Sequence, residues 1–319
     1  MKPAFKAAAA SLAVAGAVIA GFTGCSQNAN GGEDKQVLGI VQFSGSDVFS
    51  NSALEGGEAH AKKQGWDVKV VDAHGSVDEM NAAMTNLVTT GADALLVSVF
   101  PSEALAAGVA SAVEASVPVA SWGGGTSDGV QFAAEVGLDD VSQQMVDDLG
   151  GKGEILALGY RPGLPCQHRE EKLDEVLKGT SIQQTKQQIT IPGQVESAQA
   201  AASAWAAAHP AGDTPLAIWA CFDDPATGVV AALRDLGRTD ILTYGNNGTQ
   251  SSVSLVETGE LTATQWINSP KQGADLVTLL LSYIEDPESA DVPQVIGGET
   301  VVVTKDSVEE FLASNPVLY

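Results

Sequence analysis

Two neighbouring apolar runs, residues 216–220 and 241–244, each end in a short group of polar and aromatic residues. These groups contain Cys221, Phe222, Asp223, Asn246 and Asn247. Carboxylate and amide side chains exchange hydrogen bonds with hydroxyl groups, and an aromatic ring offers an apolar face to C–H groups. The chemistry that this combination favours is the binding of a small polyhydroxylated molecule.

The surrounding residues predict a strand, a helix, a second strand and a loop. Asp223 and Asp224 offer a carboxylate cap, and Pro225 is tolerated in the first helical turn. The helix that follows has one apolar side and ends at Gly237, and the second run is broken by the loop at 245–248. This order is a parallel crossover unit, and ligands of open parallel sheets bind beyond the carboxyl ends of the strands. We therefore expect the two groups to meet at one edge of a sheet.

This stretch resembles the sugar-binding proteins of bacterial ABC importers, the ribose/galactose-binding type I periplasmic binding family. In that family one strand ends in an Asn-Asp motif, and the next ends in a Gly-x-Asp-Gly loop whose acidic residue binds sugar hydroxyls. Asp223 keeps the Asp of the first motif, Phe222 stands where Asn is usual, and Asn247 takes the position of the acid. The resemblance covers nearly everything after residue 36 in element order, and only these motifs in residue identity.

The first half of the chain also alternates between strand and helix. Apolar runs of strand length and helical stretches follow one another at residues 37–41, 68–71, 77–89, 94–99, 102–115 and 117–121. This alternation predicts an α/β fold with a parallel sheet and helices on both faces. The first run is not followed by a glycine-rich phosphate-binding motif, so we expect no nucleotide cofactor.

The resemblance implies two Rossmann-like lobes with parallel sheets, joined by a three-segment hinge. After a first crossing near residues 132–140 the alternation begins again, and we expect strands at 154–158, near 188–191 and at 262–265. The expected division of the chain is a lipoprotein signal peptide (1–24), a flexible tether (25–35), an N-terminal lobe (36–136 plus 270–297) and a C-terminal lobe (137–269 plus 298–319).

The resemblance also implies ligand contacts from the N-terminal lobe, at Asp47, Phe49, Ser98 and Trp122. Phe49 is equally explained as an apolar residue that packs the start of a helix, and Trp122 has the alternative of packing between the lobes. Many family members have an Asp-Arg pair where this chain has glycines at 123–124. We expect this change to remove a strong acceptor and to open space beside the Trp122 ring.

From the C-terminal lobe the resemblance implies contacts by Arg169, Trp266 and an amide, in addition to the two motif residues and Phe222. The Arg169 guanidinium offers a rigid fork for vicinal hydroxyls, and its alternative is an ion pair with Glu170 or Glu171. Either Asn268 or Gln265 supplies the amide, and the sequence leaves that choice open.

The N-terminus and the cysteines indicate export. Lysines at 2 and 6 precede an apolar run at 7–22 that is shorter than a membrane-spanning helix, which is typical of an export signal. The residues at 22–25 resemble a lipobox, with Cys25 as the lipidated residue, and the alternative is a plain secretory signal. Outside the cytoplasm an even pair of cysteines tends to be joined, and the family fold implies a disulfide between Cys166 and Cys221. Two separate thiols are the alternative.

The net charge of the chain argues against anionic binding partners. The chain has 319 residues and a formal net charge of −24, and loss of residues 1–24 would remove two lysines and no acid. Such a surface repels nucleic acid and anionic lipid. Sugar repressors share the family fold, but their N-terminal DNA-binding domain is replaced here by the export signal.

No catalytic, metal or cofactor motif is present in the sequence. The four histidines are scattered, and no nucleophile elbow or paired metal-ligand spacing occurs. We therefore predict a monomeric, lipid-anchored receptor that captures a small neutral sugar or polyol and delivers it to ABC permease subunits. The alternatives are a receptor that signals to a membrane sensor and an enzyme of sugar metabolism. The sequence does not identify the ligand.

Overall fold

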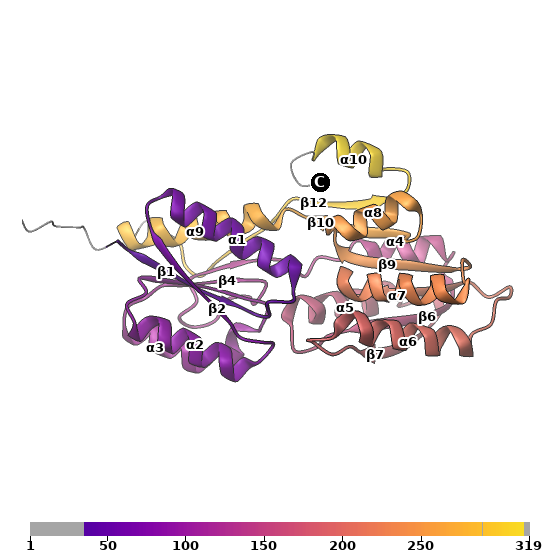
Figure 1. Cartoon of the computed structure of the whole chain (residues 1–319), viewed down its shortest axis with the longest axis horizontal. Helices are drawn as coiled ribbons and strands as arrows, with labels where there is room; N and C mark the ends of the chain where they lie inside the picture. Colours follow the sequence, from indigo (N-terminus) through magenta and orange to yellow (C-terminus); the bar gives the residue numbers. More distant parts are fainter. Residues whose placement is uncertain (1–34, 289, 316–319) are drawn as a thin grey trace, which may run out of the picture. The chain divides into compact units, whose positions relative to one another are not determined.

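The computed structural model describes residues 35–288 and 290–315, which fold as two sheets (Figure 1). The first sheet has six strands in the order β11-β5-β4-β3-β1-β2. Its strands are β1 (Val37–Gln42), β2 (Asp67–Asp72), β3 (Ala94–Ser98), β4 (Val119–Trp122), β5 (Phe132–Ala134) and β11 (Gln294–Ile296). All five neighbouring pairs are parallel.

Helices cover both faces of the first sheet. The helix α1 (Val48–Lys63) packs against α9 (Ser269–Glu285) on one face, and α2 (Val77–Thr89) packs against α3 (Ala106–Glu114) on the other (Figure 1). A short 3-10 turn, Ser102–Leu105, leads into α3. Because both faces are covered, β3 is buried along its whole length, which explains its continuous apolar sequence.

The second sheet has the order β12-β10-β9-β8-β6-β7, and only its β10–β12 pair is antiparallel among the described strands. Its strands are β6 (Lys152–Gly159), β7 (Ser181–Gln188), β8 (Leu216–Ala220), β9 (Ile241–Asn247), β10 (Ala263–Ile267) and β12 (Thr300–Thr304). Its helices are α4 (Val141–Asp148), α5 (Leu164–Val176), α6 (Gln194–Ala208), α7 (Asp223–Leu236), α8 (Gln250–Thr258) and α10 (Val308–Ser314).

The chain passes between the two sheets three times, after β5, after β10 and after β11. The predicted α/β class, with two parallel sheets and a three-segment connection, is confirmed. The division into lobes at particular residues stays a prediction, because residues 35–319 form one compact unit. The signal peptide and the lipidated Cys25 lie outside the described residues. No helix within the described ranges is long and apolar enough to cross a membrane.

The sequence analysis misplaced one strand. We expected a strand near residues 188–191, whereas β7 occupies Ser181–Gln188 and ends where the expected strand begins. The reason is that β7 is an edge strand of the sheet and most of its residues are exposed. A polar run such as SIQQTKQQ lacks the apolar alternation that marks a half-buried strand.

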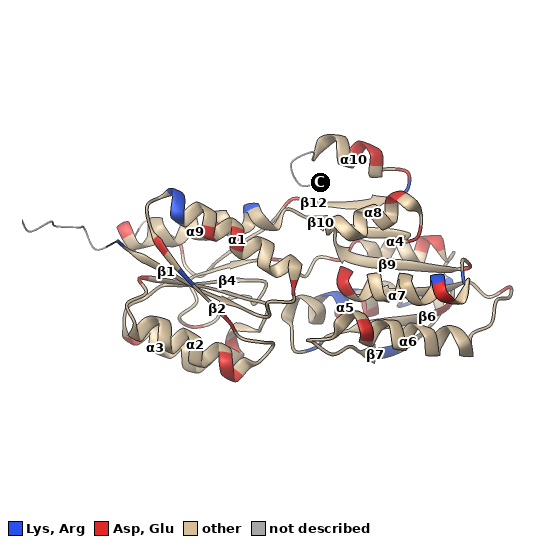
Figure 2. Cartoon of the chain, viewed as in Figure 1, with Lys and Arg blue, Asp and Glu red and all other residues tan. Residues whose placement is uncertain are grey.

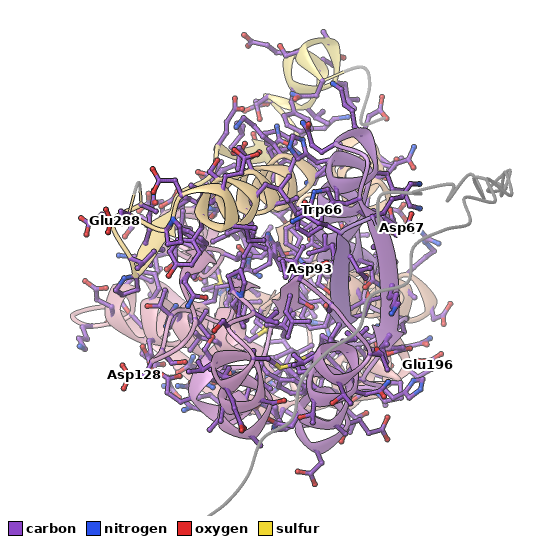
Figure 3. All side chains as sticks on the ribbon, turned by 90° about the vertical axis from the view of Figure 1, so that its left-hand side faces the viewer. Trp66, Asp67, Asp93, Asp128, Glu196 and Glu288 are labelled. Atoms are coloured by element: carbon purple, nitrogen blue, oxygen red, sulfur yellow. A yellow bond between two sulfur atoms is a disulfide. The ribbon has the colours of Figure 1, made fainter. Side chains whose placement is uncertain are left out.

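The parallel strands of the first sheet all begin at the same end of the sheet, opposite their carboxyl ends. Figure 3 shows this end, where Trp66, Asp67 and Asp93 lie together. The Asp93 carboxylate accepts a hydrogen bond of 2.7 Å from the backbone N–H of Val37, the first residue of β1. This bond satisfies a strand-end donor that has no partner in the ladder.

Helices α1 and α9 approach closely because small residues lie at their contact. A Cβ atom on Gly56 would lie 2.1 Å from the carbonyl oxygen of Pro270, and one on Gly273 would lie 1.7 Å from the carbonyl oxygen of Ala53. Neither distance is possible between real atoms, so the backbones touch at this point. The contact joins the first helix of the sheet to the helix that returns from the second sheet.

Replacement of Gly273 should therefore destabilise the protein. We expect Gly273→Ala to lower the free energy of unfolding by about 2–3 kcal/mol, because overpacking outweighs the better helix propensity of alanine. The matched control is Gly297→Ala, whose added Cβ would meet no atom within 4 Å. Urea unfolding of both variants measures the effect, and an unchanged midpoint for Gly273→Ala would contradict the contact.

Candidate functional site

A pocket lies at the carboxyl ends of the strands and takes residues from both sheets. Its lining residues are Phe43, Asp47, Phe49, Val99, Trp122, Val136, Tyr160, Gly163, Pro165, Cys166, Arg169, Ile191, Phe222 and Asn247. The centres of water molecules can reach about 40 Å³ of it. The pocket is therefore narrow.

Five of the fourteen lining residues are aromatic. The Phe43 and Tyr160 rings meet edge to face with centroids 5.8 Å apart, and Phe49 meets Trp122 in the same way at 5.2 Å. Phe222 contributes the fifth ring from the end of β8. The Trp122 indole Nε1 donates to Oε1 of Gln272 on α9 at 3.1 Å, which fixes the plane of the ring. The structure places Phe49, Trp122 and Phe222 in the lining of this pocket, and their contact with a ligand stays a prediction.

Asp47 supplies a carboxylate to this apolar wall. It is the N-cap of α1, and its Oδ1 accepts from the backbone N–H of Ser50 at 3.2 Å. Burial raises the pKa of Asp47 to about 6, with a smaller contribution from the negative charge of Asp224, while the hydrogen bonds from Ser50 oppose the rise. Burial also raises the pKa of Tyr160 to about 12, and the charge of Asp47 adds to it. The carboxylate and the phenol therefore lie within electrostatic reach of each other.

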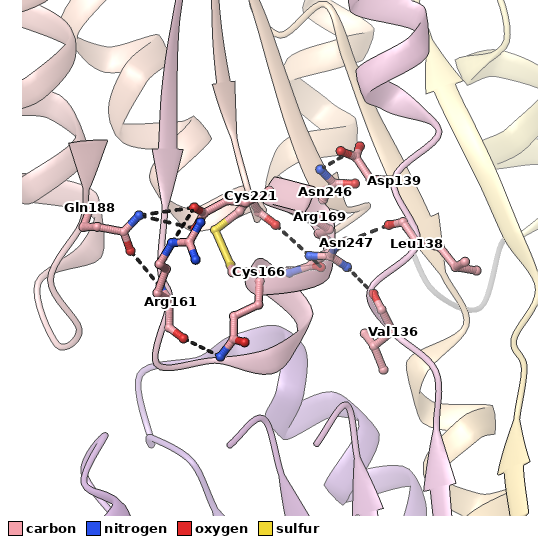
Figure 4. Close-up of a disulfide and its surroundings, with 12 residues drawn as sticks. Val136, Leu138, Asp139, Arg161, Cys166, Arg169, Gln188, Cys221, Asn246 and Asn247 are labelled. Carbon is pink, nitrogen blue, oxygen red and sulfur yellow. Dashed lines mark hydrogen bonds and ion pairs between the residues drawn. A yellow bond between two sulfur atoms is a disulfide. The ribbon is translucent and has the colours of Figure 1, made fainter. Parts of the chain in front are cut away.

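Arg169 is held by the protein itself (Figure 4). Its Nη1 donates to the carbonyl oxygen of Cys221 at 2.7 Å and to Oδ1 of Asn247 at 3.0 Å. Its Nη2 donates to the carbonyl oxygen of Val136 at 2.8 Å, and its Nε donates to that of Leu138 at 3.3 Å. A guanidinium has five N–H donors. These four bonds use four of the five N–H groups. The remaining N–H, on Nη2, has no acceptor among the described residues.

The charge of Arg169 survives burial. Its side chain is 1% exposed, and burial lowers its pKa to about 10, while several carboxylates, Asp139 first among them, raise it again. The group is therefore protonated at neutral pH. The expected alternative, an ion pair with Glu170 or Glu171 on a solvated surface, is not what the structure contains. Glu170 is paired with Arg161 instead, at 3.3 Å.

Asn247 has an unusual backbone. It ends β9 with a φ of +118°, a region that residues with a Cβ rarely occupy. Its side chain lines the pocket, and it also lines a neighbouring hollow that shares Phe49 and contains Trp266. Trp266 therefore lies next to the pocket and not in its wall.

A disulfide joins Cys166 and Cys221, with Cα atoms 5.3 Å apart. It connects the first turn of α5 to the end of β8, and Cys166 is part of the pocket lining. Figure 4 shows that the disulfide lies beside Arg169 and its hydrogen-bond partners. The covalent link and the guanidinium therefore hold the same two elements together.

Asp223 faces away from the pocket. It is fully buried, and it is absent from the described lining residues. Its Oδ2 accepts from the backbone N–H of Thr249 at 2.7 Å and from the Thr249 hydroxyl at 3.1 Å, and its Oδ1 accepts from the Thr264 hydroxyl at 2.7 Å. The expectation that this carboxylate caps helix α7 is wrong, because the N-cap is Phe222 and no side chain caps the helix. Burial raises the pKa of Asp223 to about 7 despite these hydrogen bonds.

Three other residues singled out from the sequence have internal partners. Ser98 Oγ accepts from the backbone N–H of Phe43 at 3.1 Å, and Asn268 caps α9 through the backbone N–H of Lys271. Gln265, the alternative amide, accepts at 2.6 Å from the backbone N–H of Asp140. None of these three side chains lines the pocket of the described structure.

The glycines after Trp122 do not open space, contrary to expectation. A Cβ on Gly124 would lie 2.3 Å from both the carbonyl oxygen of Phe100 and Oγ of Ser121, and one on Gly123 would lie 3.0 Å from the Pro165 ring. The space that a side chain would need is filled by backbone and by a residue of the second sheet. These glycines therefore permit a close approach between segments.

The sequence analysis missed several lining residues, of which Tyr160 is the most informative. It follows β6, so it stands at the carboxyl end of a strand, where an aromatic residue is a candidate ligand contact. Its hydroxyl has no hydrogen-bond partner among residues 35–288 and 290–315. The position of Tyr160 at the end of a strand could have identified it from the sequence as a candidate ligand contact.

The charge of the surface agrees with the composition of the sequence. Figure 2 shows acidic residues spread over helices of both sheets. Within the part of the chain that the structure describes, no group of three or more His, Cys, Asp or Glu side chains is arranged to hold a metal ion.

Known proteins with similar sequences are binding proteins. The chain is 26% identical over 306 residues to a xylitol-binding protein of Mycolicibacterium smegmatis, covering 93% of this chain and 86% of that protein. It is 25% identical over 251 residues to the ribose import binding protein of Bacillus subtilis, covering 74% and 77% of the two chains.

Solved structures share the fold. An ABC transporter solute-binding protein from Agrobacterium vitis with bound allitol matches with a TM-score of 0.81 and 23% identity, over 88% of this chain and 99% of that one. A galactofuranose-binding protein matches with a TM-score of 0.78 and 17% identity, over 89% and 99%. The sequence model of the periplasmic binding protein domain matches residues 38–288, well over half of the chain. With its two parallel sheets and its pocket at their carboxyl edges, the chain belongs to the periplasmic binding protein family.

Proposed function

We propose that this protein is an extracytoplasmic receptor that captures a small neutral sugar or polyol and delivers it to an ABC permease. The observation that carries the proposal is the pocket, in which five aromatic rings surround a few polar groups at the carboxyl edge of both sheets. Aromatic faces pack on the C–H surface of a polyol, and a small number of fixed polar groups orient its hydroxyls.

The polar groups that remain for a ligand favour a compact, neutral molecule. They are the Asp47 carboxylate, the Tyr160 hydroxyl, one N–H of Arg169 and the amide nitrogen of Asn247. An acidic ligand would be repelled by the Asp47 carboxylate, and Arg169 keeps only one N–H with which to bind it, because four of its N–H groups donate to the protein. The names of the xylitol- and allitol-binding relatives support a linear polyol in particular.

Uptake of such a ligand requires movement. The centres of water molecules can reach only about 40 Å³ of the pocket, and a pentitol has ten non-hydrogen atoms. We infer that the walls move apart about the three connecting segments and close again on the ligand, and that the permease recognises the closed form. Contacts across the pocket, such as the backbone bond from Leu164 N–H to the Val99 carbonyl oxygen at 3.0 Å, would break on opening.

The rest of the proposal concerns location and assembly. The lobes would comprise residues 36–136 with 270–297 and residues 137–269 with 298–319. The protein would act as a monomer, without catalysis, anchored to the cell membrane by a lipid on Cys25. Replacement of Cys25 by Ser, followed by fractionation of cells, tests the anchor, since the variant should leave the membrane fraction.

The ligand class is tested by thermal unfolding of residues 26–319 with xylitol, allitol, D-allose, myo-inositol, amino acids and nucleosides. A ligand present at 100 times its dissociation constant should stabilise the folded protein by about 2.7 kcal/mol. We expect a shift from at least one neutral polyol or sugar, and we expect Asn247→Ala to give a smaller shift at the same ligand concentration. Asn86→Ala, at an exposed position of α2, is the control and should keep the shift. A response to amino acids or nucleosides alone would exclude the sugar or polyol assignment.

The pH dependence of binding tests Asp47. Its pKa of about 6 means that the anionic form, which accepts the stronger hydrogen bond, is lost as the pH falls through 6. We expect the affinity for the polyol to be constant above pH 7 and to fall below pH 6. Asp47→Asn should bind about tenfold more weakly at pH 8, because a charge-assisted hydrogen bond is about twice as strong as a neutral one.

The same titration includes a matched control. Asp47→Asn should show a smaller fall in affinity at low pH, with only the part that protonation of Asp223 contributes, whereas Asp78→Asn, an exposed residue in the first turn of α2, should keep the whole fall. Isothermal titration between pH 5 and pH 8 provides the measurement. A wild-type affinity that stays flat across this range would remove Asp47 from the list of ligand acceptors.

A further inference from the structure

Asp223 is a buried carboxylate whose hydrogen bonds serve neither the ligand nor its own helix. It is 0% exposed, no side chain caps α7, and the pocket lining does not include it. Its three donors are neutral groups, and no ion pair joins it to a cation among the described residues. The charge of Arg169 lies within electrostatic reach of Asp223, but a buried carboxylate without an ion pair is costly, so an apolar residue would be the better choice if stability were its only role.

The three hydrogen bonds all lead to the chain that follows Asn247. Thr249 donates twice to Oδ2, through its backbone N–H at 2.7 Å and its hydroxyl at 3.1 Å. Thr264 donates to Oδ1 at 2.7 Å, and the same hydroxyl accepts at 3.2 Å from the backbone N–H of Gly248. Asp223 therefore binds Thr249 directly and Gly248 through Thr264, and these are the two residues that follow Asn247.

The carboxylate also touches the chain that precedes Asn247. A Cβ atom on Gly245 would lie 2.5 Å from Oδ1 of Asp223, so this carboxylate lies against the β9 backbone two residues before Asn247. The backbone is thus fixed on both sides of Asn247, whose φ of +118° would relax if either side were free.

The orientation of the Asn247 side chain depends on that backbone. Its Oδ1 accepts from Arg169 Nη1 at 3.0 Å, and this bond leaves the amide nitrogen as the group that remains for a ligand. We propose that Asp223 is a positioning residue, which holds Asn247 in the backbone conformation that turns its amide toward the bound ligand. The inference rests on the proposed function, because it concerns the ligand of the same pocket.

A double-mutant cycle between Asp223 and Asn247 tests this role. The wild type and the variants Asp223→Asn, Asn247→Ala and Asp223→Asn/Asn247→Ala are titrated calorimetrically with whichever of xylitol, allitol, D-allose and myo-inositol binds the wild type most tightly. We expect Asp223→Asn to weaken binding about tenfold when Asn247 is present, a size typical of coupling within one hydrogen-bond network. In the Asn247→Ala background the same substitution should weaken binding less than twofold.

The cycle separates positioning from a loss of stability. Thermal unfolding without ligand should show the same destabilisation by Asp223→Asn in both backgrounds, since its lost hydrogen bonds do not involve the Asn247 side chain. Asp235→Asn, an exposed acid of the same helix, is the control and should change neither affinity nor unfolding temperature. If Asp223→Asn does not fold, Thr264→Val replaces it in the cycle, because that change removes the link from Asp223 to Gly248.

The possible failures are distinguishable. Equal losses of affinity in the two backgrounds would overturn the positioning role while leaving the proposed function intact. A wild-type protein that binds none of the four compounds, nor any other sugar or polyol in the thermal screen, would overturn the proposed function and this inference with it.

Discussion

The buried guanidinium of Arg169 is the interaction on which the site depends. It donates to Val136 and Leu138 in the segment between the sheets, to Cys221 at the end of β8 and to Asn247 at the end of β9. Removing a charge from water costs several kcal/mol unless acceptors surround it, so these segments have to converge on the group. Carbonyl oxygens where strands end need donors in return. The planar fork of arginine meets both needs, whereas the compact ammonium of a lysine could not reach the same acceptors together.

The hydrogen bonds of Arg169 to the protein limit what this side chain can contribute to selectivity for a ligand. A guanidinium that donates four of its N–H groups to the protein cannot also bind two vicinal hydroxyls, because only one N–H is left. Under the proposed function, orientation of a ligand then falls to Asp47 and Tyr160 on one side of the pocket and to the Asn247 amide on the other. The aromatic rings give affinity without much directional preference. A pocket of this kind distinguishes ligands mainly by size and by where one hydroxyl meets the Asp47 carboxylate.

Much of the fold could be predicted from the sequence, and less of the site. The apolar runs of β1, β3 and β8 are buried strands, and such runs are visible without a structure because burial on both faces demands apolar residues. The edge strand β7 is exposed and left no such signal. In the site, residue types indicated which positions lie at strand ends, but not the direction in which each side chain points. Asp223 carries the right group and faces inward, Tyr160 was overlooked, and Gly124 has a packing role that only the neighbouring Phe100 carbonyl reveals.

Side chains alternate in direction at the end of β8. The Phe222-Asp223 pair can therefore differ from the Asn-Asp motif of the family without loss of the hydrogen bonds that Asp223 makes. Successive residues of an extended chain point to opposite sides, and here Phe222 lines the pocket while Asp223 binds Thr249 and Thr264 inside the sheet. A change from an amide to an aromatic ring at 222 alters only the surface that the ligand meets. The carboxylate at 223 is free to keep the turn after β9 in place. In the receptor that we propose, adjacent positions therefore divide between them the recognition of the ligand and the geometry that recognition requires.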